Sequence, residues 1–128
     1  PFDQELVQWL TGRPELEGIP ASTLTPADRP DRFITVERTG GEYSTAGIDR
    51  PSLAIQCWAP TMTEAAQLAQ LLSLRVLPAV YDLPDVGRFS VDSVYDYPLD
   101  ERSPRYQITA SAVIHTAYSK QAEDSSKE

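Results

Sequence analysis

The sequence predicts a single α+β domain, in which a mixed, mainly antiparallel sheet of about four or five strands packs against two helices. Two segments carry apolar residues at helical spacing, and four runs alternate apolar with polar residues as half-buried strands do. The chain has 128 residues, 41% hydrophobic and 23% charged, which suits one globular core and is too short for two. No apolar run approaches the roughly 20 residues of a membrane span, so we expect a soluble protein without membrane contact.

The first helix is predicted over residues 3–11. Apolar residues recur at helical spacing from Phe2 to Leu10, and acidic residues stand near the start. Gly12 follows the last apolar position, and glycine is a common helix stop. The segment 14–30 that comes next is rich in proline, which favours extended or turn backbone, so we expect a connector with one short strand near residues 19–24.

The second helix is predicted from Thr61 to about Leu77. Thr61 and Glu64 have the spacing of a capping box, in which a hydroxyl and a carboxylate satisfy backbone N–H groups at the start of a helix. Pro78 is expected to end the helix, because proline lacks the N–H that continues it. Five residues form the apolar stripe that would face a sheet: Ala65, Leu68, Ala69, Leu72 and Val76.

Four runs of alternating, β-branched-rich sequence predict the main strands. The first is expected to end at the glycine pair Gly40 and Gly41, which predicts a turn and a long loop over residues 39–50. The last run predicts one core face and one wetter face. The core face holds Tyr106, Ile108, Ala110, Ala112, Ile114 and Tyr118, and the wetter face holds Gln107, Thr109, Ser111 and His115. The predicted strands span residues 33–38, 52–58, 88–97 and 105–118.

No catalytic or metal-binding constellation is predicted. The chain holds one cysteine and one histidine, which excludes a disulfide framework and a Cys/His zinc set. Cys57 shares a strand face with apolar residues, whereas His115 lies opposite the apolar face of its strand, so the two point to opposite sides of a common sheet. Asp92 and Asp96 share a face in a regular strand, but about 13 Å separates them, too far to hold one ion. We expect a protein that is not an enzyme and needs no cofactor.

The charge distribution disfavours tight nucleic-acid binding. The net charge is -8, and affinity for phosphate backbones comes mainly from Lys and Arg. Acidic residues concentrate between residues 82 and 101, where Arg88 is the single cation, so we expect a negative surface there. Its six carboxylates are Asp82, Asp85, Asp92, Asp96, Asp100 and Glu101.

The pair Glu37 and Arg38 ends the first predicted strand. Neighbours in a strand face opposite ways, so these two cannot act as one catalytic pair. Charges at a strand end beside a loop suit solvation, and they equally suit ion pairs with another subunit. The candidate interface residues at this end are Glu37, Arg38, Glu42, Asp49 and Arg50.

Three stretches carry a resemblance to a known family. They are ITVERTGGE at residues 34–42, DRPSLAIQCWAPTMTEAAQLA at 49–69 and PRYQITASAVIHT at 104–116. In this order they resemble the tail terminator proteins of long-tailed bacteriophages, especially those of actinobacteria. The resemblance covers residues 3–118 in element order and is sharpest over 34–69. It suggests a domain over residues 1–118. The composition of residues 119–128, in which one alanine is the single apolar residue, predicts a disordered polar tail that departs from the family, as does the proline-rich stretch 14–30.

The resemblance implies a structural virion protein. Such subunits form a ring, usually a hexamer, that caps the tail tube, stops its polymerisation and joins the tail to head completion proteins. The implied partners are the chain itself, the major tail tube protein and the connector proteins, in the virion and in the host cytoplasm during assembly. DNA would pass the lumen without specific binding, and the acids of residues 82–101 are lumen candidates. The alternatives are another head-tail connector or neck component of the same fold, or a small ligand-binding domain or enzyme.

Overall fold

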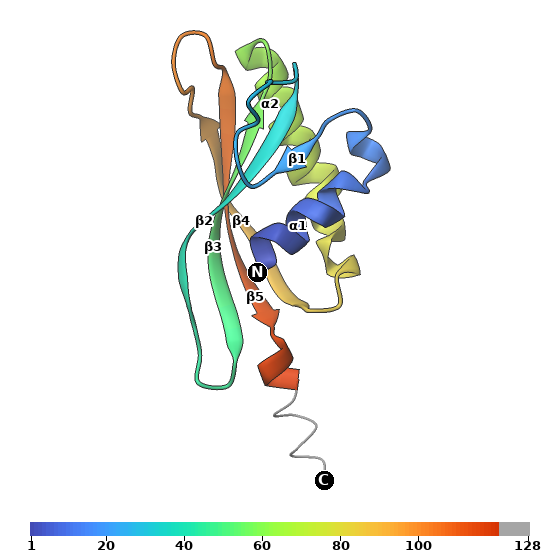
Figure 1. The fold of residues 1–128 in the computed structure, drawn as a ribbon, viewed down its shortest axis with the longest axis vertical. Coiled ribbons are helices and arrows are strands. Elements are labelled where there is room, and N and C mark those ends of the chain that lie inside the picture. Colours follow the sequence, from blue (N-terminus) through green and yellow to red (C-terminus); the bar gives the residue numbers. More distant parts are fainter. Residues whose placement is uncertain (121–128) are drawn as a thin grey trace.

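The computed structural model describes residues 1–120 and confirms the α+β class. One sheet carries five strands in the order β1-β2-β3-β5-β4, and the helices lie together on one side of it (Figure 1). The pair β1–β2 is parallel and all other neighbours are antiparallel, as the mixed, mainly antiparallel prediction requires. The strands are β1 (Ala21–Ser22), β2 (Phe33–Tyr43), β3 (Ile48–Trp58), β4 (Val86–Asp96) and β5 (Arg105–His115).

The two helices begin where the sequence predicts. Helix α1 spans Phe2–Thr11, and α2 spans Met62–Leu71 with Thr61 as its N-cap, whose hydroxyl accepts the N–H of Glu64 at 3.2 Å. The end of α2 differs from the prediction. The helical path loosens into a π-helix over Leu72–Val76 and then tightens into a 3-10 helix over Leu77–Asp82. Pro78 stands in the first turn of that 3-10 helix, where its missing N–H is not needed.

The core lies between the helices and one face of the sheet. Leu6 and Leu10 of α1 and Leu72 beyond α2 are fully buried against Ile55 of β3 and Ile108 of β5. Burial of such side chains stabilises the fold by about 25 cal/mol per Å² of apolar area. In the described chain the opposite face carries no helix, and Figure 1 shows it uncovered on the left of the sheet. We call it the helix-free face.

The predicted loop over residues 39–50 is wrong. Strand β2 runs on to Tyr43 and β3 begins at Ile48, so the two form a long hairpin that projects beyond the body of the molecule (Figure 1). The glycine pair lies inside the strand, next to a register shift between Arg38 and Gly40. Gly41 has a positive φ of +98, which glycine adopts easily and which occurs in some strand bulges. Glycine therefore marks a bulge here rather than a strand end.

Two peripheral segments complete the described chain. The short strand expected near residues 19–24 is β1, which pairs with Ile34 and Thr35 of β2. Residues 117–120 are helical, so the predicted disorder is wrong for residues 119 and 120, and the rest of that prediction falls on 121–128, outside the described residues. Among residues 1–120, no helix combines the length and apolarity that a membrane crossing requires.

Candidate functional site

The two potentially reactive side chains, Cys57 and His115, are separated as predicted. Cys57 is buried in the core, and this burial raises the pKa of its thiol. In the sheet, Cys57 of β3 lies opposite Tyr106 of β5, whereas His115 lies at the far end of β5, opposite Ile48 of β3. The thiol and the imidazole therefore lie at different heights and on opposite faces of the sheet. They cannot act as a nucleophile and its base.

The prediction that Asp92 and Asp96 share a face is wrong. A register shift between Val91 and Ser93 inserts one residue into β4 and reverses the alternation beyond it. Asp92 lies on the helix-free face, where it accepts a hydrogen bond from Ser111 Oγ at 2.5 Å. Asp96 faces the side of α2. In residues 1–120, no group of three His, Cys, Asp or Glu side chains is placed to hold a metal ion.

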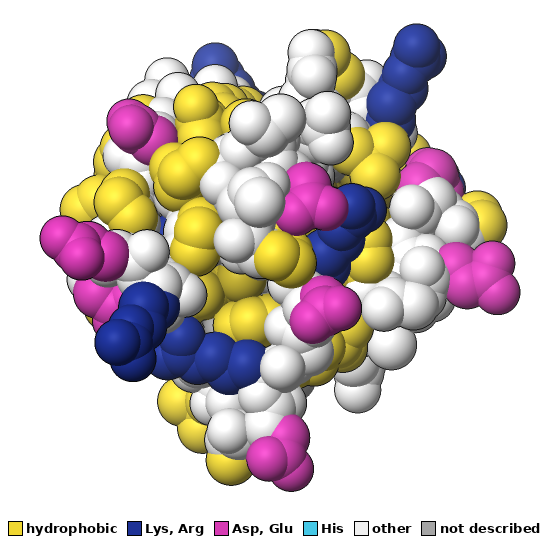
Figure 2. Space-filling model, turned by 90° about the horizontal axis from the view of Figure 1, so that it is seen from above, with side chains coloured by type: hydrophobic (Ala, Val, Ile, Leu, Met, Phe, Trp, Pro, Cys, Tyr) yellow, Lys and Arg dark blue, Asp and Glu magenta, His cyan; other side chains and the backbone are white. Residues whose placement is uncertain are grey.

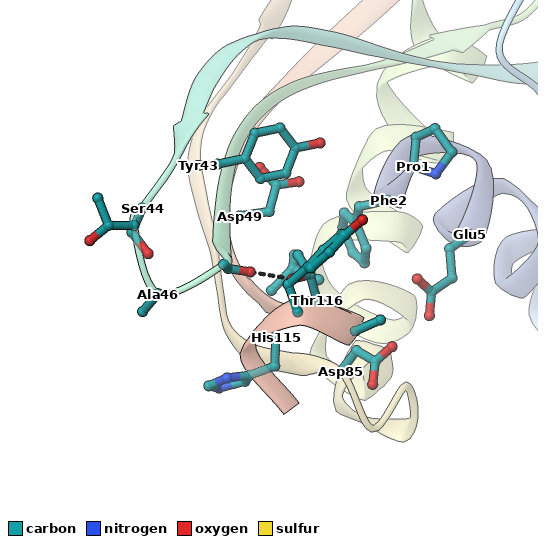
Figure 3. Close-up of a pocket in the computed structure, with 15 residues that line it drawn as sticks. Pro1, Phe2, Glu5, Tyr43, Ser44, Ala46, Asp49, Asp85, His115 and Thr116 are labelled. Atoms are coloured by element: carbon teal, nitrogen blue, oxygen red, sulfur yellow. Dashed lines mark hydrogen bonds between the residues drawn. The ribbon is translucent and has the colours of Figure 1, made fainter. Parts of the chain in front are cut away.

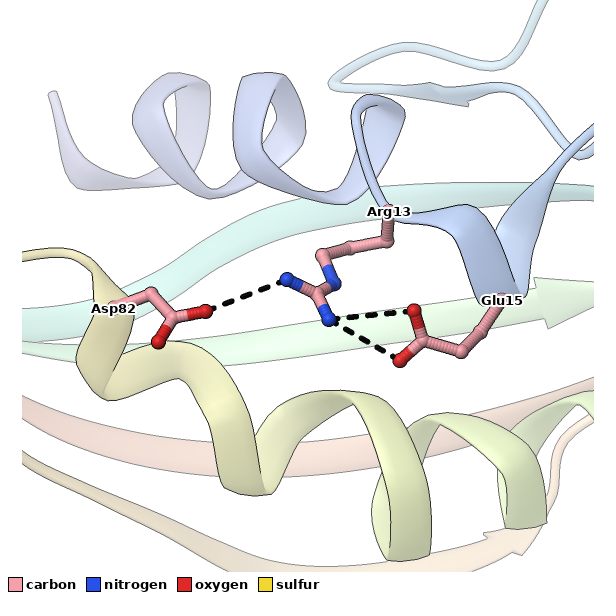
Figure 4. A network of polar contacts seen from close by, with 3 residues as sticks. All are labelled: Arg13, Glu15 and Asp82. Carbon is pink, nitrogen blue, oxygen red and sulfur yellow. Dashed lines mark hydrogen bonds and ion pairs between the residues drawn. The ribbon is translucent and has the colours of Figure 1, made fainter.

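The acids of residues 82–101 do not form one negative surface. Asp82 and Asp85 lie at one end of β4, and each has a cation: Arg13 Nη1 is 3.3 Å from Asp82 Oδ2, and Lys120 pairs with Asp85. Figure 4 shows Arg13 bridging Glu15 and Asp82. Asp100 lies beyond the other end, where the backbone N–H of Arg102 donates to it and lowers its pKa.

Figure 2 views the molecule along its long axis, from the end that carries the loop between β4 and β5. The acidic side chains visible there are spread around the rim and between exposed apolar groups. A β-strand rises about 3.3 Å per residue, so the 11-residue β4 separates the two ends of this acidic segment by about 35 Å. The continuous surface predicted from sequence proximity is therefore wrong. The assignment of individual acids to a lumen stays a prediction.

Glu37 and Arg38 face opposite sides, as predicted, and Arg38 has a partner within the chain. Its Nη1 and Nη2 donate to the two carboxylate oxygens of Asp49 at 2.7 and 2.8 Å, and this contact raises the pKa of Arg38. The guanidinium also lies 5.6 Å from the Tyr43 ring centroid. Asp49 is only 4% exposed. Sequence reasoning missed this pair because it placed Asp49 in a loop, whereas the extended hairpin brings it beside Arg38.

The other three interface candidates lie exposed on the hairpin. Glu42 and Arg50 stand directly opposite each other on β2 and β3, and Glu37 lies further up β2, opposite Ala54. Arg50 and Arg88 of β4 line one shallow groove on the helix-free face. No ion pair in residues 1–120 includes Glu42, Arg50 or Arg88.

A hydrogen-bonded relay of side chains crosses the helix-free face from β2 to β4. Its residues are buried except for Tyr95, although no described helix covers them, and each buried amide or hydroxyl has a hydrogen-bond partner. In the sequence, the signal for this relay was the set of polar residues that alternate with apolar residues along the strands. Trp58 Nε1 donates to Thr35 Oγ1 (2.9 Å), Thr35 donates to Gln56 Oε1 (2.7 Å), Gln56 Nε2 donates to Gln107 Oε1 (3.0 Å), and Gln107 Nε2 donates to the Tyr95 hydroxyl.

Both edges of the sheet are open in the described part of the chain. On one side, β4 has no strand beyond it along its whole length, and it exposes Val91, Val94 and Tyr95 at 38%, 43% and 36%. On the other side, β1 covers only the start of β2, so the edge of β2 is free from Val36 to Tyr43. Long edge strands with exposed apolar side chains offer unpaired N–H and C=O groups to another chain.

One side chain guards part of the β4 edge. The hydroxyl of Tyr81 accepts the backbone N–H of Phe89 at 2.9 Å. Tyr81 itself is 52% exposed, on the 3-10 helix next to the edge. This hydrogen bond occupies the N–H of Phe89, and the rest of β4 beyond Phe89 stays accessible to another strand.

A cleft of about 800 Å³ lies between the start of α1, the tip of the hairpin and the end of β5 (Figure 3). Its floor includes Phe2, and its acids are Glu5, Asp49 and Asp85. Asp49 and Asp85 already hold cations from the same chain. In Figure 3 the ring of His115 points away from Glu5 and Asp85, so the cleft does not gather groups for acid–base chemistry.

Comparison with known proteins adds no family to this geometry. The chain matches no protein-family model, and no curated protein matches it.

Proposed function

We propose that this protein is a structural ring subunit of a bacteriophage tail that works as tail terminators do. In this role the ring caps the tail tube, stops its polymerisation and joins it to the head completion proteins. The observation that carries the proposal is a sheet with a free edge on each side, β4 on one and the outer half of β2 on the other. A subunit with two different adhesive edges joins its neighbours head to tail, and such contacts close into rings.

Three further observations support an assembly role. The β2–β3 hairpin extends beyond the packed body, where it can reach a component above or below a ring (Figure 1). The described residues bring together no nucleophile and base, and in the cleft beside the tip of the hairpin Asp49 and Asp85 are paired with cations of the same chain. The net charge of -8 would keep DNA that passes the ring from adhering to it. The hexameric number and the identity of the tube and head partners rest on the sequence resemblance.

Electron microscopy of the purified protein, alone and mixed with tail tubes, tests the proposal. We expect rings of uniform diameter, free or at one end of the tubes, and tubes of constant length when the protein is present during polymerisation. Native mass spectrometry should give one discrete stoichiometry. A protein that stays monomeric and leaves tube ends bare in every condition would contradict the proposal.

A double variant, Cys57→Ala with His115→Ala, serves as the control for the enzyme alternative. The ring function uses neither side chain, so the variant should form rings as the wild type does. The connector alternative differs in position: a connector would bind head proteins and leave tube length unchanged. Tube length in the mixing experiment therefore separates these two roles.

A further inference from the structure

We propose that neighbouring copies join by antiparallel pairing of β4 in one copy with the free part of β2 in the next, in a register that sets Arg88 beside Glu42 of the next copy. The inference rests on the ring of the proposed function and names the contact that builds it. The occupant of the β4 edge is thus a second copy of this chain.

The direction of the strands favours this pairing. Strands β2 and β3, β3 and β5, and β5 and β4 are each antiparallel, so β2 and β4 run in opposite directions within one sheet. A rotation about an axis along the strands leaves strand direction unchanged. The β2 of the next copy therefore meets β4 in the antiparallel sense. Pairing of β4 with a second β4 needs a two-fold axis and ends at a dimer.

The register follows from the rows of the sheet, where a row is the set of residues that lie opposite one another across neighbouring strands. Glu42 pairs with Arg50, and Arg88 pairs with Val113. Arg50 and Val113 belong to the same row, since the β3–β5 register continues on both sides of them. One row on the helix-free face thus begins with Glu42 at one edge and ends with Arg88 at the other. The same rotation keeps equal rows at equal height, which places the carboxylate of one copy against the guanidinium of the next.

The backbone groups agree with this register. In an antiparallel edge strand, alternate residues direct their N–H and C=O outward. Phe89 faces outward, because the Tyr81 hydroxyl accepts its N–H. On β2, Ser44 donates its N–H to β3, so by alternation Glu42 also faces β3 and Gly41 faces outward. Gly41 and Phe89 occupy the row next to that of Arg88, so the aligned register brings outward groups together.

The side chains agree as well. Neither Arg88 nor Glu42 has an ion-pair partner in residues 1–120, and both are exposed. Directly opposite residues in an antiparallel pair have Cβ atoms about 5 Å apart, within reach of a salt bridge. The Tyr81 hydroxyl must leave Phe89 when the next strand arrives. Its ring is half exposed, so it can turn away without opening the core.

Engineered cysteines test the register, because the native Cys57 is buried and gives little background. The double variant Glu42→Cys, Arg88→Cys should form disulfides between copies under mild oxidation, in conditions where microscopy shows rings. In this register Glu42 and Arg88 stand next to the outward-facing Gly41 and Phe89, so they form a non-hydrogen-bonded pair, whose Cα atoms lie about 4.5 Å apart and suit a disulfide. A non-reducing gel should show a ladder whose highest band gives the number of subunits in the ring.

The matched control is Glu37→Cys with Arg88→Cys. Glu37 lies on the same strand and face as Glu42 but four rows away, about 13 Å at 3.3 Å per row, so no ladder is expected. Charge reversal gives an independent readout. Arg88→Glu should lower the yield of rings about tenfold or more, and adding Glu42→Arg should restore it.

Each outcome decides between the two proposals. Rings that cross-link in the Glu37→Cys double variant and not in the Glu42→Cys double variant would overturn the register. Rings that cross-link in neither variant, and that tolerate Arg88→Glu, would overturn the edge pairing while the ring function stands. A folded protein that forms no ring, even with tail tubes, would overturn both.

Discussion

At the scale of single residues, the Arg38–Asp49 pair is the clearest stabilising contact on the hairpin. Asp49 is almost fully buried and its two oxygens are both held by one guanidinium. Removal of one member leaves a buried charge without a partner, which costs more than the pair itself contributes. The pair joins β2 to β3 on the projecting hairpin, so it positions the strand whose outer edge is free.

We predict that Arg38→Gln lowers the free energy of unfolding by about 2–3 kcal/mol, because it leaves the Asp49 carboxylate buried with a weaker partner. Urea unfolding followed by circular dichroism measures the change. The control is Arg50→Gln on the neighbouring strand. Arg50 is exposed and has no ion-pair partner among residues 1–120, so its substitution should change stability by less than about 0.5 kcal/mol. Equal effects of the two substitutions would show that the ion pair contributes nothing specific.

At the scale of elements, the sequence predicted what short-range patterns encode. The helix starts, the four main strands and the opposite orientation of Cys57 and His115 all follow from periodicity and capping residues. The hairpin was missed because glycine ends many strands, and only the cross-strand register shows that Gly40 and Gly41 lie within one. The two bulges in β4 were missed as well, since an inserted residue leaves no trace in composition.

The adjacent glycines Gly40 and Gly41 of strand β2 should respond differently to substitution. A Cβ on Gly41 would lie 2.1 Å from the carbonyl oxygen of Arg50, at a φ of +98, whereas a Cβ on Gly40 meets no atom within 4 Å. We predict that Gly41→Ala destabilises the protein by about 2 kcal/mol and that Gly40→Ala changes stability by less than about 1 kcal/mol. Thermal unfolding compares the two, and similar melting temperatures would contradict the strained geometry at Gly41.

At the scale of the whole molecule, the open edges need protection in the free subunit. Tyr81 provides part of it by holding the Phe89 N–H, and the bulge bends the strand beyond it. The sequence indicated a helix end near Pro78 but not that Tyr81 would lie beside β4. That contact depends on the π and 3-10 turns after α2, which long-range packing selects over a regular helix.

We predict that Tyr81→Phe lowers the protein concentration at which rings form, since it frees an edge donor for the next copy. Mass photometry over a dilution series measures this threshold. Tyr118→Phe is the control, because Tyr118 is 77% exposed and lies beside Gly47 in the hairpin turn, whereas the hydroxyl that contacts the Phe89 backbone is that of Tyr81. A threshold that is unchanged or higher in Tyr81→Phe would argue against a guarding role.

The relay on the helix-free face has a mechanical consequence. In a ring closed edge to edge, tension along the circumference acts across the strands, which is the direction of the chain of bonds from Trp58 to Tyr95. These side-chain bonds lie in parallel with the backbone ladder and share the same load. Stretching around such a ring would therefore be resisted by side-chain hydrogen bonds as well as by those of the backbone.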